Sequence, residues 1–356
     1  VSPWLPAFLR PRPSPPLHPD YRGGSLLNLM ATLTEGLGLP SRGYRPLAAD
    51  KRLTAAELAA SGQIVLLVVD GLGDEILARI GPDTLLAGHR RAGLTSVFPS
   101  TTASAVPTLL TGLPPAAHGL TGWHMWFEEI GETLAVLPLL PRRPPPPDWN
   151  PAALPPRLFS ALPLARQLAG RNWMVSPRNI CDSACNRYHG DGAIRVSYQG
   201  TADFFSAIED AVAAARRNPG AAGPAYIHAY YPVLDGLMHE YGTGDPRVGQ
   251  RLQRFDAAFA ACLDRLAGSD TLFVVTADHG FIDAPRRHLI ELDAHPQLAA
   301  LLARPLCGER RVAYAYVAPA NQEAFAAYVR RHLAHACHLF SGAEFIAAGG
   351  FGPGPA

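Results

Sequence analysis

Gln63-Ile-Val-Leu-Leu-Val-Val-Asp70-Gly71-Leu72-Gly73 is the stretch that decides the fold class of this chain. An uninterrupted apolar run of this length, closed by glycine, predicts a strand that is buried on both faces, as in a parallel sheet. Asp70 stands at its carboxyl end, where open α/β sheets bind their ligands. A second such run, residues 271–277, leads into Asp278-His279-Gly280. We therefore predict an α/β fold in which two buried strands bring residues of metal-binding type to one edge of the sheet.

The composition limits the size and the partners of the protein. The chain has 356 residues, of which 48% are hydrophobic, and a formal net charge of +1. This length suits one large α/β domain, or a core domain with an inserted cap. The near-neutral charge predicts no footprint for nucleic acid or for an anionic membrane. Lys51 is the only lysine, so a phosphate-binding loop of the Gly-Lys-Ser/Thr type is excluded.

Cysteine usage and hydropathy indicate a compartment. The five cysteines are an odd number and lie scattered along the chain, which predicts free thiols rather than a disulfide framework or a structural zinc site. The amino-terminal residues contain many prolines and do not have the form of a signal peptide. The chain has no apolar stretch long enough to span a membrane. We expect a cytoplasmic protein without a membrane segment; the sequence leaves its oligomeric state open.

Proline-rich segments divide the chain. Residues 1–20 are expected to form a disordered or extended tail, and residues 21–350 the main domain. A second proline cluster within 138–163 excludes a central strand or a helix interior there. We interpret it as the start of a small inserted, cap-like region at about 138–200. An ordered loop that wraps the domain is the alternative.

The clearest helix starts at Asp245-Pro246, a capping residue followed by proline in the first helical position. Apolar residues spaced by threes and fours continue it to about residue 266. A strand at 225–230 precedes this helix and the strand at 271–277 follows it, which predicts a βαβ unit with parallel strands. Shorter runs predict helices at 201–216 and 321–336 and strands at 93–98 and 311–317.

Four clusters of chemically capable residues follow the predicted strands. Taken singly, each has an ordinary structural explanation, such as a helix cap, a turn or a solvated helix face. Together they supply carboxylates, imidazoles and a hydroxyl, a mixture that suits two divalent ions, with zinc first and manganese next. The clusters are Asp70; the hydroxyl-rich turn Phe98-Pro99-Ser100-Thr101-Thr102; Asp235-x-x-x-His239; and Asp278-His279 with His288 and, less convincingly, His295 downstream.

As a set, these motifs resemble the alkaline phosphatase superfamily, and within it the type I phosphodiesterase/nucleotide pyrophosphatase family. The matching pieces occur in the family's order over residues from about 20 to 320. They are Val-Val-Asp70-Gly-Leu-Gly, Phe-Pro-Ser-Thr-Thr102, Leu-Leu-Thr-Gly112-Leu-Pro-Pro-Ala-Ala-His118-Gly119, Asp235-x-x-x-His239 and Thr-Ala-Asp278-His279-Gly280-Phe. The resemblance implies a mostly parallel central sheet flanked by helices on both faces.

The resemblance also implies a ligand set. One metal ion would be held by Asp70, Thr102, Asp278 and His279, and Thr102 would be the nucleophile because it lies three residues after the proline of the motif. The other ion would take Asp235, His239 and a later histidine. That histidine is assigned to His288, with His295 as the alternative.

The function implied is a two-metal phosphoesterase that hydrolyses phosphodiester or phosphoric anhydride bonds through a covalent phospho-threonine at Thr102. Two cations about 4 Å apart stabilise the attacking and the leaving oxygen of an in-line displacement. The substrate would be a small phosphate ester, with a nucleotide as one candidate. The alternatives are a phosphonate or phosphomonoester hydrolase, a phosphomutase, or a non-catalytic metal-binding scaffold.

One position departs from the family pattern. The family usually places an asparagine after the His-Gly pair, where its amide contacts a phosphoryl oxygen; by spacing, that position is Trp123. The indole N–H of Trp123 can donate a hydrogen bond but does not reproduce the geometry of an amide. We therefore assign Trp123 and His124 to substrate binding, with Thr121 as a further candidate. Trp123, Trp126 and Phe127 would stack on a base or pack in the core.

Overall fold

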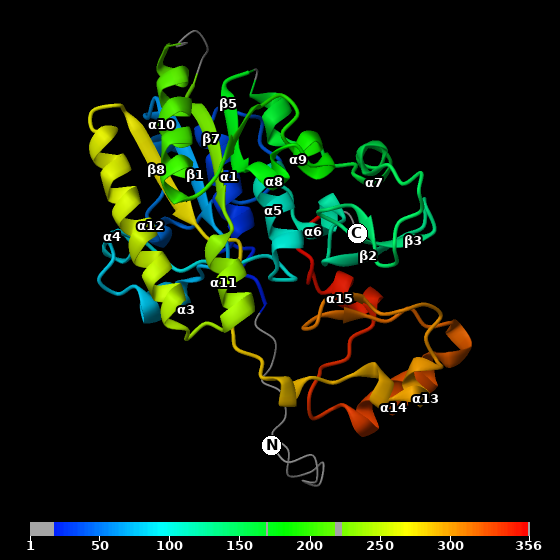
Figure 1. Ribbon diagram of the computed structural model, residues 1–356. Coiled ribbons are helices and arrows are strands. Elements are labelled where there is room, and N and C mark those ends of the chain that lie inside the picture. The colour runs from blue at the N-terminus through cyan, green and yellow to red at the C-terminus, as the bar shows by residue number, and fades with distance from the viewer. Residues whose placement is uncertain (1–17, 169, 218–222, 355–356) are drawn as a thin grey trace.

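The computed structural model describes residues 18–168, 170–217 and 223–354 (Figure 1). Most of the predicted tail, residues 1–17, lies outside this part of the chain. The centre is a parallel sheet with the strand order β6-β5-β7-β1-β8. Its strands are β1 (Gln63–Val69), β5 (Asn172–Pro177), β6 (Ile194–Tyr198), β7 (Ala225–Tyr231) and β8 (Thr271–Thr276). The predicted α/β class with a parallel sheet is confirmed.

Strand β1 lies inside the sheet because it offers apolar side chains to both faces. All seven of its residues are buried. Alternate side chains of a strand point to opposite faces, and those of β1 enter two separate cores. Val65, Leu67 and Val69 pack with side chains of α10 (Thr201–Arg217) and α12 (Pro246–Arg265). Ile64, Leu66 and Val68 pack with α1 (Leu26–Gly36) and α5 (Thr102–Thr111).

The predicted βαβ unit is present, with one difference in pairing. Asp245 caps α12 through the backbone N–H of Arg247, and β7 and β8 run parallel on either side of that helix in the sequence. They are not neighbours in the sheet, because β1 lies between them and pairs with both. The ends of β1, β7 and β8 therefore meet at one edge, which is what positions the site described below.

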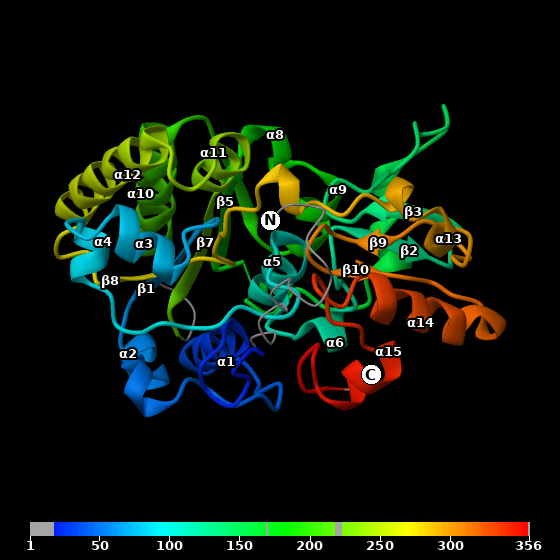
Figure 2. The same ribbon diagram turned by 90° about the horizontal axis from the view of Figure 1, so that it is seen from below.

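A second, antiparallel sheet lies beside the first, with the order β10-β9-β2-β3-β4. Figure 2 shows it on the other side of α5 from β1, β7 and β8 of the parallel sheet. Segments far apart in the sequence form it, since β9 and β10 return from beyond residue 300. Its strands are β2 (His124–Phe127), β3 (Glu132–Ala135), β4 (Leu140–Pro141), β9 (Cys307–Gly308) and β10 (Ala313–Tyr314).

Three predicted regions differ from the structure. The insertion predicted at about 138–200 contributes β5 and β6 to the parallel sheet, so its second half belongs to the core of the fold. The predicted strand at 93–98 is reduced to a single bridge between Ser25 and Thr95. The predicted strand at 311–317 shortens to the two residues of β10.

Within the described residues no helix is long and apolar enough to cross a bilayer. All five cysteines are free thiols, four of them buried. The other α-helices, in chain order, are α2 (Ala55–Ala59), α3 (Asp74–Ile80), α4 (Leu85–Gly88), α6 (Pro115–His118), α7 (Pro155–Leu158), α8 (Arg178–Cys181), α9 (Ala184–His189), α11 (Val233–Tyr241), α13 (Pro296–Ala299), α14 (Gln322–His332) and α15 (Gly342–Ala347).

Candidate active site

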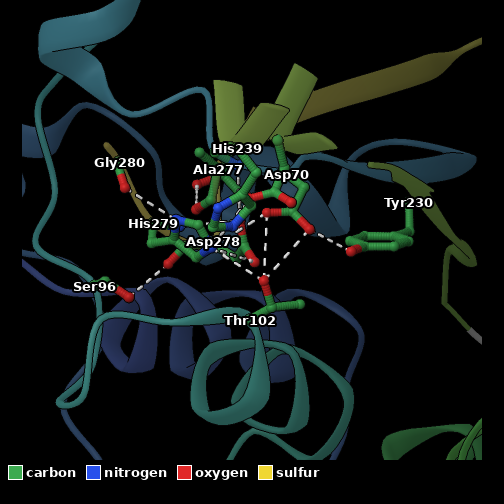
Figure 3. Close-up of polar contacts among 12 residues, drawn as sticks. Asp70, Ser96, Thr102, Tyr230, His239, Ala277, Asp278, His279 and Gly280 are labelled. Atoms are coloured by element: carbon green, nitrogen blue, oxygen red, sulfur yellow. Dashed lines mark hydrogen bonds and ion pairs between the residues drawn. The ribbon is translucent and has the colours of Figure 1, made fainter. Parts of the chain in front are cut away.

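Asp70 follows β1 directly and is buried at the edge of the sheet. The hydroxyl of Tyr230, from the end of the neighbouring strand β7, donates a hydrogen bond to one of its carboxylate oxygens (Figure 3). Burial raises the pKa of Asp70 well above its usual range, and the nearby charges of Asp278 and Asp235 raise it further. A buried carboxylate in this setting needs a positive partner.

Asp278 and His279 follow β8 and meet Asp70 from the other side. One carboxylate oxygen of Asp278 accepts the backbone N–H groups of Gly71, at 3.2 Å, and of His279, at 3.0 Å. Its other oxygen is buried and has no hydrogen-bond partner within the described residues. Nδ1 of His279 lies 3.0 Å from the carbonyl oxygen of Gly280 and can donate to it, which leaves Nε2 with a free lone pair facing the site.

Glycines permit the close approach of the two strand ends. A Cβ atom on Gly73 would lie 2.5 Å from Cα of Gly280, closer than two non-bonded carbon atoms tolerate. Gly71 has a φ angle of +74°, a conformation that side chains with a Cβ atom seldom adopt. The Gly-Leu-Gly after Asp70 therefore brings its carboxylate next to Asp278 and His279.

Thr102 lies opposite this group, at the first position of α5. Its Oγ1 is 3.4 and 3.5 Å from the two carboxylate oxygens of Asp70 and 3.0 Å from Nε2 of His279 (Figure 3). Thr101, the N-cap, makes no side-chain capping bond. The start of α5 thus presents backbone N–H groups and a positive dipole end to the same pocket as the Thr102 hydroxyl.

Asp235 and His239 come from α11, which follows β7. Nε2 of His239 is 3.5 Å from Oδ1 of Asp235, as their spacing of four residues on a helix predicts. The same oxygen is 3.9 Å from Nε2 of His279, so the α11 pair adjoins the first group. Oδ1 of Asp235 has no hydrogen bond within the described chain, and burial raises the pKa of this carboxyl.

These donors fit a divalent cation. Ligand atoms of Asp70, Asp278 and His279 all lie within 4.8 Å of one another. The buried, unpartnered oxygens of Asp278 and Asp235 are what a cation would satisfy. Oxygen and imidazole ligands suit zinc or manganese. The residues present therefore fit the ion that the sequence predicts at Asp70, Asp278 and His279, with Asp235 and His239 beside it.

The structure does not bring His288 to this cluster. His288 ends a short 3-10 helix, Arg286–His288, on the segment that leaves the end of β8 for the lobe with α13 and α14 (Figure 1). It is exposed and does not line the pocket. His295 lies in that lobe, with Nδ1 3.0 Å from the hydroxyl of Tyr328. The prediction that His288 completes the second metal site stays a prediction, because its side chain is exposed and outside the pocket in this structure.

The predicted substrate-binding residues divide between the pocket and the core. Trp123 and His124 line the pocket that contains Thr102. Phe127 is buried in the core beneath the antiparallel sheet, and the guanidinium of Arg304 covers the Trp126 ring at 4.0 Å. Of the three aromatic residues considered for stacking, only Trp123 therefore faces the site. Thr121 is not a lining residue in the described chain; its hydroxyl lies 3.9 Å from the sulfur of Met125.

The family can now be assigned. The family model described as "Type I phosphodiesterase / nucleotide pyrophosphatase" matches residues 64–347, which include every residue of the cluster. The chain belongs to this family. The predicted membership of the alkaline phosphatase superfamily is confirmed, and so is the prediction that the protein is a phosphoesterase hydrolase.

Solved structures show the same fold. Murine ectonucleotide pyrophosphatase/phosphodiesterase 5, in an inactive form in complex with AMP, is 19% identical to the chain, with a TM-score of 0.54. The match covers 76% of this chain and 70% of the murine one. The human protein is 18% identical with a TM-score of 0.52, over 77% and 70% of the two chains. No curated protein sequence matches the chain.

Three further residues belong to the site although the sequence did not single them out. The Tyr230 hydroxyl binds the Asp70 carboxylate. Tyr230 is the last residue of a predicted strand, and this position at a strand end, similar to that of Asp70, could have identified it from the sequence. The Ser96 hydroxyl donates to the backbone carbonyl of Asp278 at 2.5 Å. Glu309 lines the pocket near Thr101, and no local pattern marks it, because only the fold brings residue 309 to the nucleophile.

Proposed function

We propose that the protein is a two-metal phosphoesterase that hydrolyses phosphodiester or phosphoric anhydride bonds through a covalent phospho-threonine at Thr102. Zinc is the first candidate for the metal and manganese the second. The substrate class is a small phosphate ester, for which a nucleotide is the leading example. The observation that carries the proposal is the Thr102 hydroxyl, within 3.5 Å of both Asp70 and His279 at a helix start.

When bound, the cations would polarise the phosphoryl oxygens and stabilise the charge that develops on the attacking and leaving oxygens. Asp70, Asp278 and His279 would hold one ion; Asp235 and His239 would hold the other. The third protein ligand of the second ion is left open by the geometry. Because Asp278 is fixed by two backbone N–H groups and Asp70 by Tyr230, these carboxylates are oriented before any ligand binds.

The chemistry at Thr102 proceeds in two displacements. In the first, Oγ1 forms a bond to phosphorus while the bond to the leaving-group oxygen breaks, and the leaving oxygen keeps the bonding electrons. The Thr102 proton departs in the same step, with the Asp70 carboxylate 3.4 Å from the hydroxyl as its nearest carboxylate acceptor. In the second, water attacks phosphorus and loses a proton, the bond to Oγ1 breaks with its electrons on Oγ1, and the Thr102 oxygen takes up that proton; the proton lost in the first step goes to solvent. The N–H groups at the start of α5 would hold the equatorial oxygens.

The test is to trap the covalent intermediate in matched variants. The metal-supplied protein is mixed with bis-p-nitrophenyl phosphate, quenched in acid and analysed by peptide mass spectrometry. We expect one p-nitrophenyl phosphoryl group on the peptide that contains Thr102, because the attack displaces only one of the two p-nitrophenolates of the substrate. Thr102→Ala should lower turnover by at least about 10³-fold and remove the phosphopeptide while the fold persists, whereas Thr102→Ser should retain both in part. Wild-type turnover in Thr102→Ala would contradict the proposal.

A further inference from the structure

Glu309 occupies the turn between β9 and β10 and reaches into the pocket of the nucleophile. Its Oε1 accepts the backbone N–H of Trp123 at 3.3 Å. The hydroxyl of Thr101, the residue before the nucleophile, lies close enough to interact with the same carboxylate. The side chain is half-buried, so the antiparallel sheet places a carboxylate directly beside the start of α5.

The position of this carboxylate is fixed by the turn that carries it. Gly308 pairs with His124 of β2 and with Ala313 of β10. It has a φ angle of +80°, and a Cβ atom there would lie 2.2 Å from the carbonyl oxygen of Val312. The N–H of Glu309 closes the turn by donating to the same carbonyl at 2.8 Å. Glu309 is thus held in one place by backbone pairing on both sides.

The charge of Glu309 has no counter-ion in the part of the chain that the structure describes. No arginine or lysine there forms an ion pair with it. Arg310 and Arg311 follow it but are exposed at the pocket rim. Glu309 is not part of the close group formed by Asp70, Asp278 and His279, and no ion pair with arginine or lysine explains a carboxylate here.

The negative charge of Glu309 would repel the negative charge on the phosphoryl oxygens of a bound substrate. For the Thr102 hydroxyl to attack, phosphorus must lie about 3–3.5 Å from Oγ1. The non-bridging oxygens of the phosphoryl group then lie within a few ångströms of the residues that flank Thr102. One of these residues is Thr101, which lies next to the Glu309 carboxylate. A phosphodiester, or an anhydride attacked at an internal phosphorus, has one negative charge on those oxygens. A phosphomonoester has two above its second pKa of about 6.

We propose that Glu309 is a specificity-determining residue, whose negative charge beside the nucleophile disfavours dianionic phosphomonoesters relative to monoanionic diesters and anhydrides. The inference rests on the proposed function and narrows its substrate class. One extra unit charge a few ångströms away, at the effective dielectric constant near a protein surface, corresponds to discrimination on the order of tenfold or more.

The test is the variant Glu309→Gln, which removes the charge but keeps an oxygen to accept from Trp123 and Thr101. Substrates are p-nitrophenyl methyl phosphate and p-nitrophenyl phosphate at pH 8, which share a leaving group and differ by one methyl and one charge. We expect the ratio of monoester to diester kcat/KM to rise about tenfold over wild type. Glu291→Gln, at an exposed position away from the pocket, should leave the ratio unchanged.

A binding measurement gives a second readout that does not depend on turnover. Calorimetry of the metal-loaded protein measures the affinity for inorganic phosphate, a dianion at pH 8, and for dimethyl phosphate, a monoanion. Glu309→Gln should raise the affinity for inorganic phosphate about tenfold relative to the affinity for dimethyl phosphate. An unchanged ratio in both experiments would assign Glu309 to holding the turn and overturn the inference. Loss of a metal ion from Glu309→Gln would make it a ligand and also overturn it. Absence of diester turnover in the wild type would instead count against the proposed function.

Discussion

At the scale of single residues, the site depends on groups that orient the metal-binding side chains. Tyr230 is the clearest of them, since its hydroxyl donates to a carboxylate oxygen of Asp70. Partners of this kind typically change metal affinity or activity by 10- to 100-fold when they are removed. The burial that raises the pKa of Asp70 makes the contribution of this donor larger, because few other groups satisfy the carboxylate.

We therefore predict that Tyr230→Phe weakens metal binding by about tenfold or more, since Asp70 loses a hydrogen bond that fixes its orientation. Metal affinity is measured by competition with a chelator. The matched control is Tyr188→Phe, which removes a hydroxyl bonded to the carbonyl of Phe159 at 2.8 Å, away from the site. Equal metal affinity in Tyr230→Phe and the wild type would show that the hydroxyl is not needed to orient Asp70.

Buried histidines away from the pocket give the fold a dependence on pH. Burial lowers the pKa of His118 to about 3 and the pKa values of His189 and His228 to about 4. His118 has protein partners, Thr108 at 3.1 Å and the N–H of Leu120 at 3.1 Å. Neither ring nitrogen of His228 has one within the described chain. Its neutral form is therefore the only one that the folded core tolerates.

The pKa of His228 is lower in the folded than in the unfolded protein, so its contribution to stability is complete above about pH 6.5. It is lost as the pH falls toward 4. Between pH 7 and 5 the wild type should lose about 2 kcal/mol through this residue, at 1.36 kcal/mol per unit of pH below 6.5. His228→Leu should remove that loss. Urea unfolding in a chelator at pH 5, 6 and 7 measures it, and parallel curves for both proteins would contradict the account.

At the scale of secondary-structure elements, the site exists because the ends of β1 and β8 almost touch. Gly73 and Gly280 make that approach possible. Gly73 has a φ angle that any residue adopts, −61°, so what its position requires is space. An added methyl group would push the loop after β1, which carries Asp70, away from the loop with Asp278 and His279.

We predict that Gly73→Ala lowers metal affinity more than tenfold and destabilises the protein by about 1–3 kcal/mol, as overpacking does. Metal titration and thermal unfolding measure the two effects. The control is Gly249→Ala in α12, where a Cβ atom has nothing within 4 Å and alanine favours the helix. Wild-type metal affinity in Gly73→Ala would mean that the loops can separate without disturbing the site.

The elements that the sequence predicts well are those whose burial leaves a pattern. Strand β1 is buried throughout, and its sequence is an uninterrupted apolar run. Helix α12 buries one face, and its apolar residues show the helical spacing. Strand β6 has mostly exposed residues, so it lacks such a run and was assigned to the insertion. Strand β5 ends in a proline, Pro177, and follows a proline-rich stretch. Its sequence therefore does not predict a strand of the central sheet.

The site residues can likewise be divided into those that a sequence pattern predicts and those that it does not. Asp70 and Asp278 were predictable because each ends a recognisable strand, and the resemblance to the family linked them to Thr102, Asp235 and His239. The assignment of His288 stays a prediction because nothing local fixes where a long connection leads. Glu309 could not be predicted, since its contact with Thr101 depends on a turn between two very short strands returning from another part of the chain.

At the scale of the whole molecule, residues from the elements of both sheets line the pocket. The parallel sheet and α11 supply the candidate metal ligands, and the antiparallel sheet supplies Trp123, His124 and Glu309. Three buried or half-buried carboxylates from separate elements, Asp70, Asp235 and Asp278, repel one another without a cation. Bound metal should therefore stabilise the fold as well as enable turnover.

The most direct measurement of the central claim is metal content by elemental analysis of the purified protein, paired with bis-p-nitrophenyl phosphate turnover before and after chelation. We predict about two zinc or manganese ions per chain. Turnover should be lost on chelation and restored by added metal, with a lower Tm in the chelated form. A protein without bound metal, and without turnover when zinc or manganese is supplied, would contradict the account.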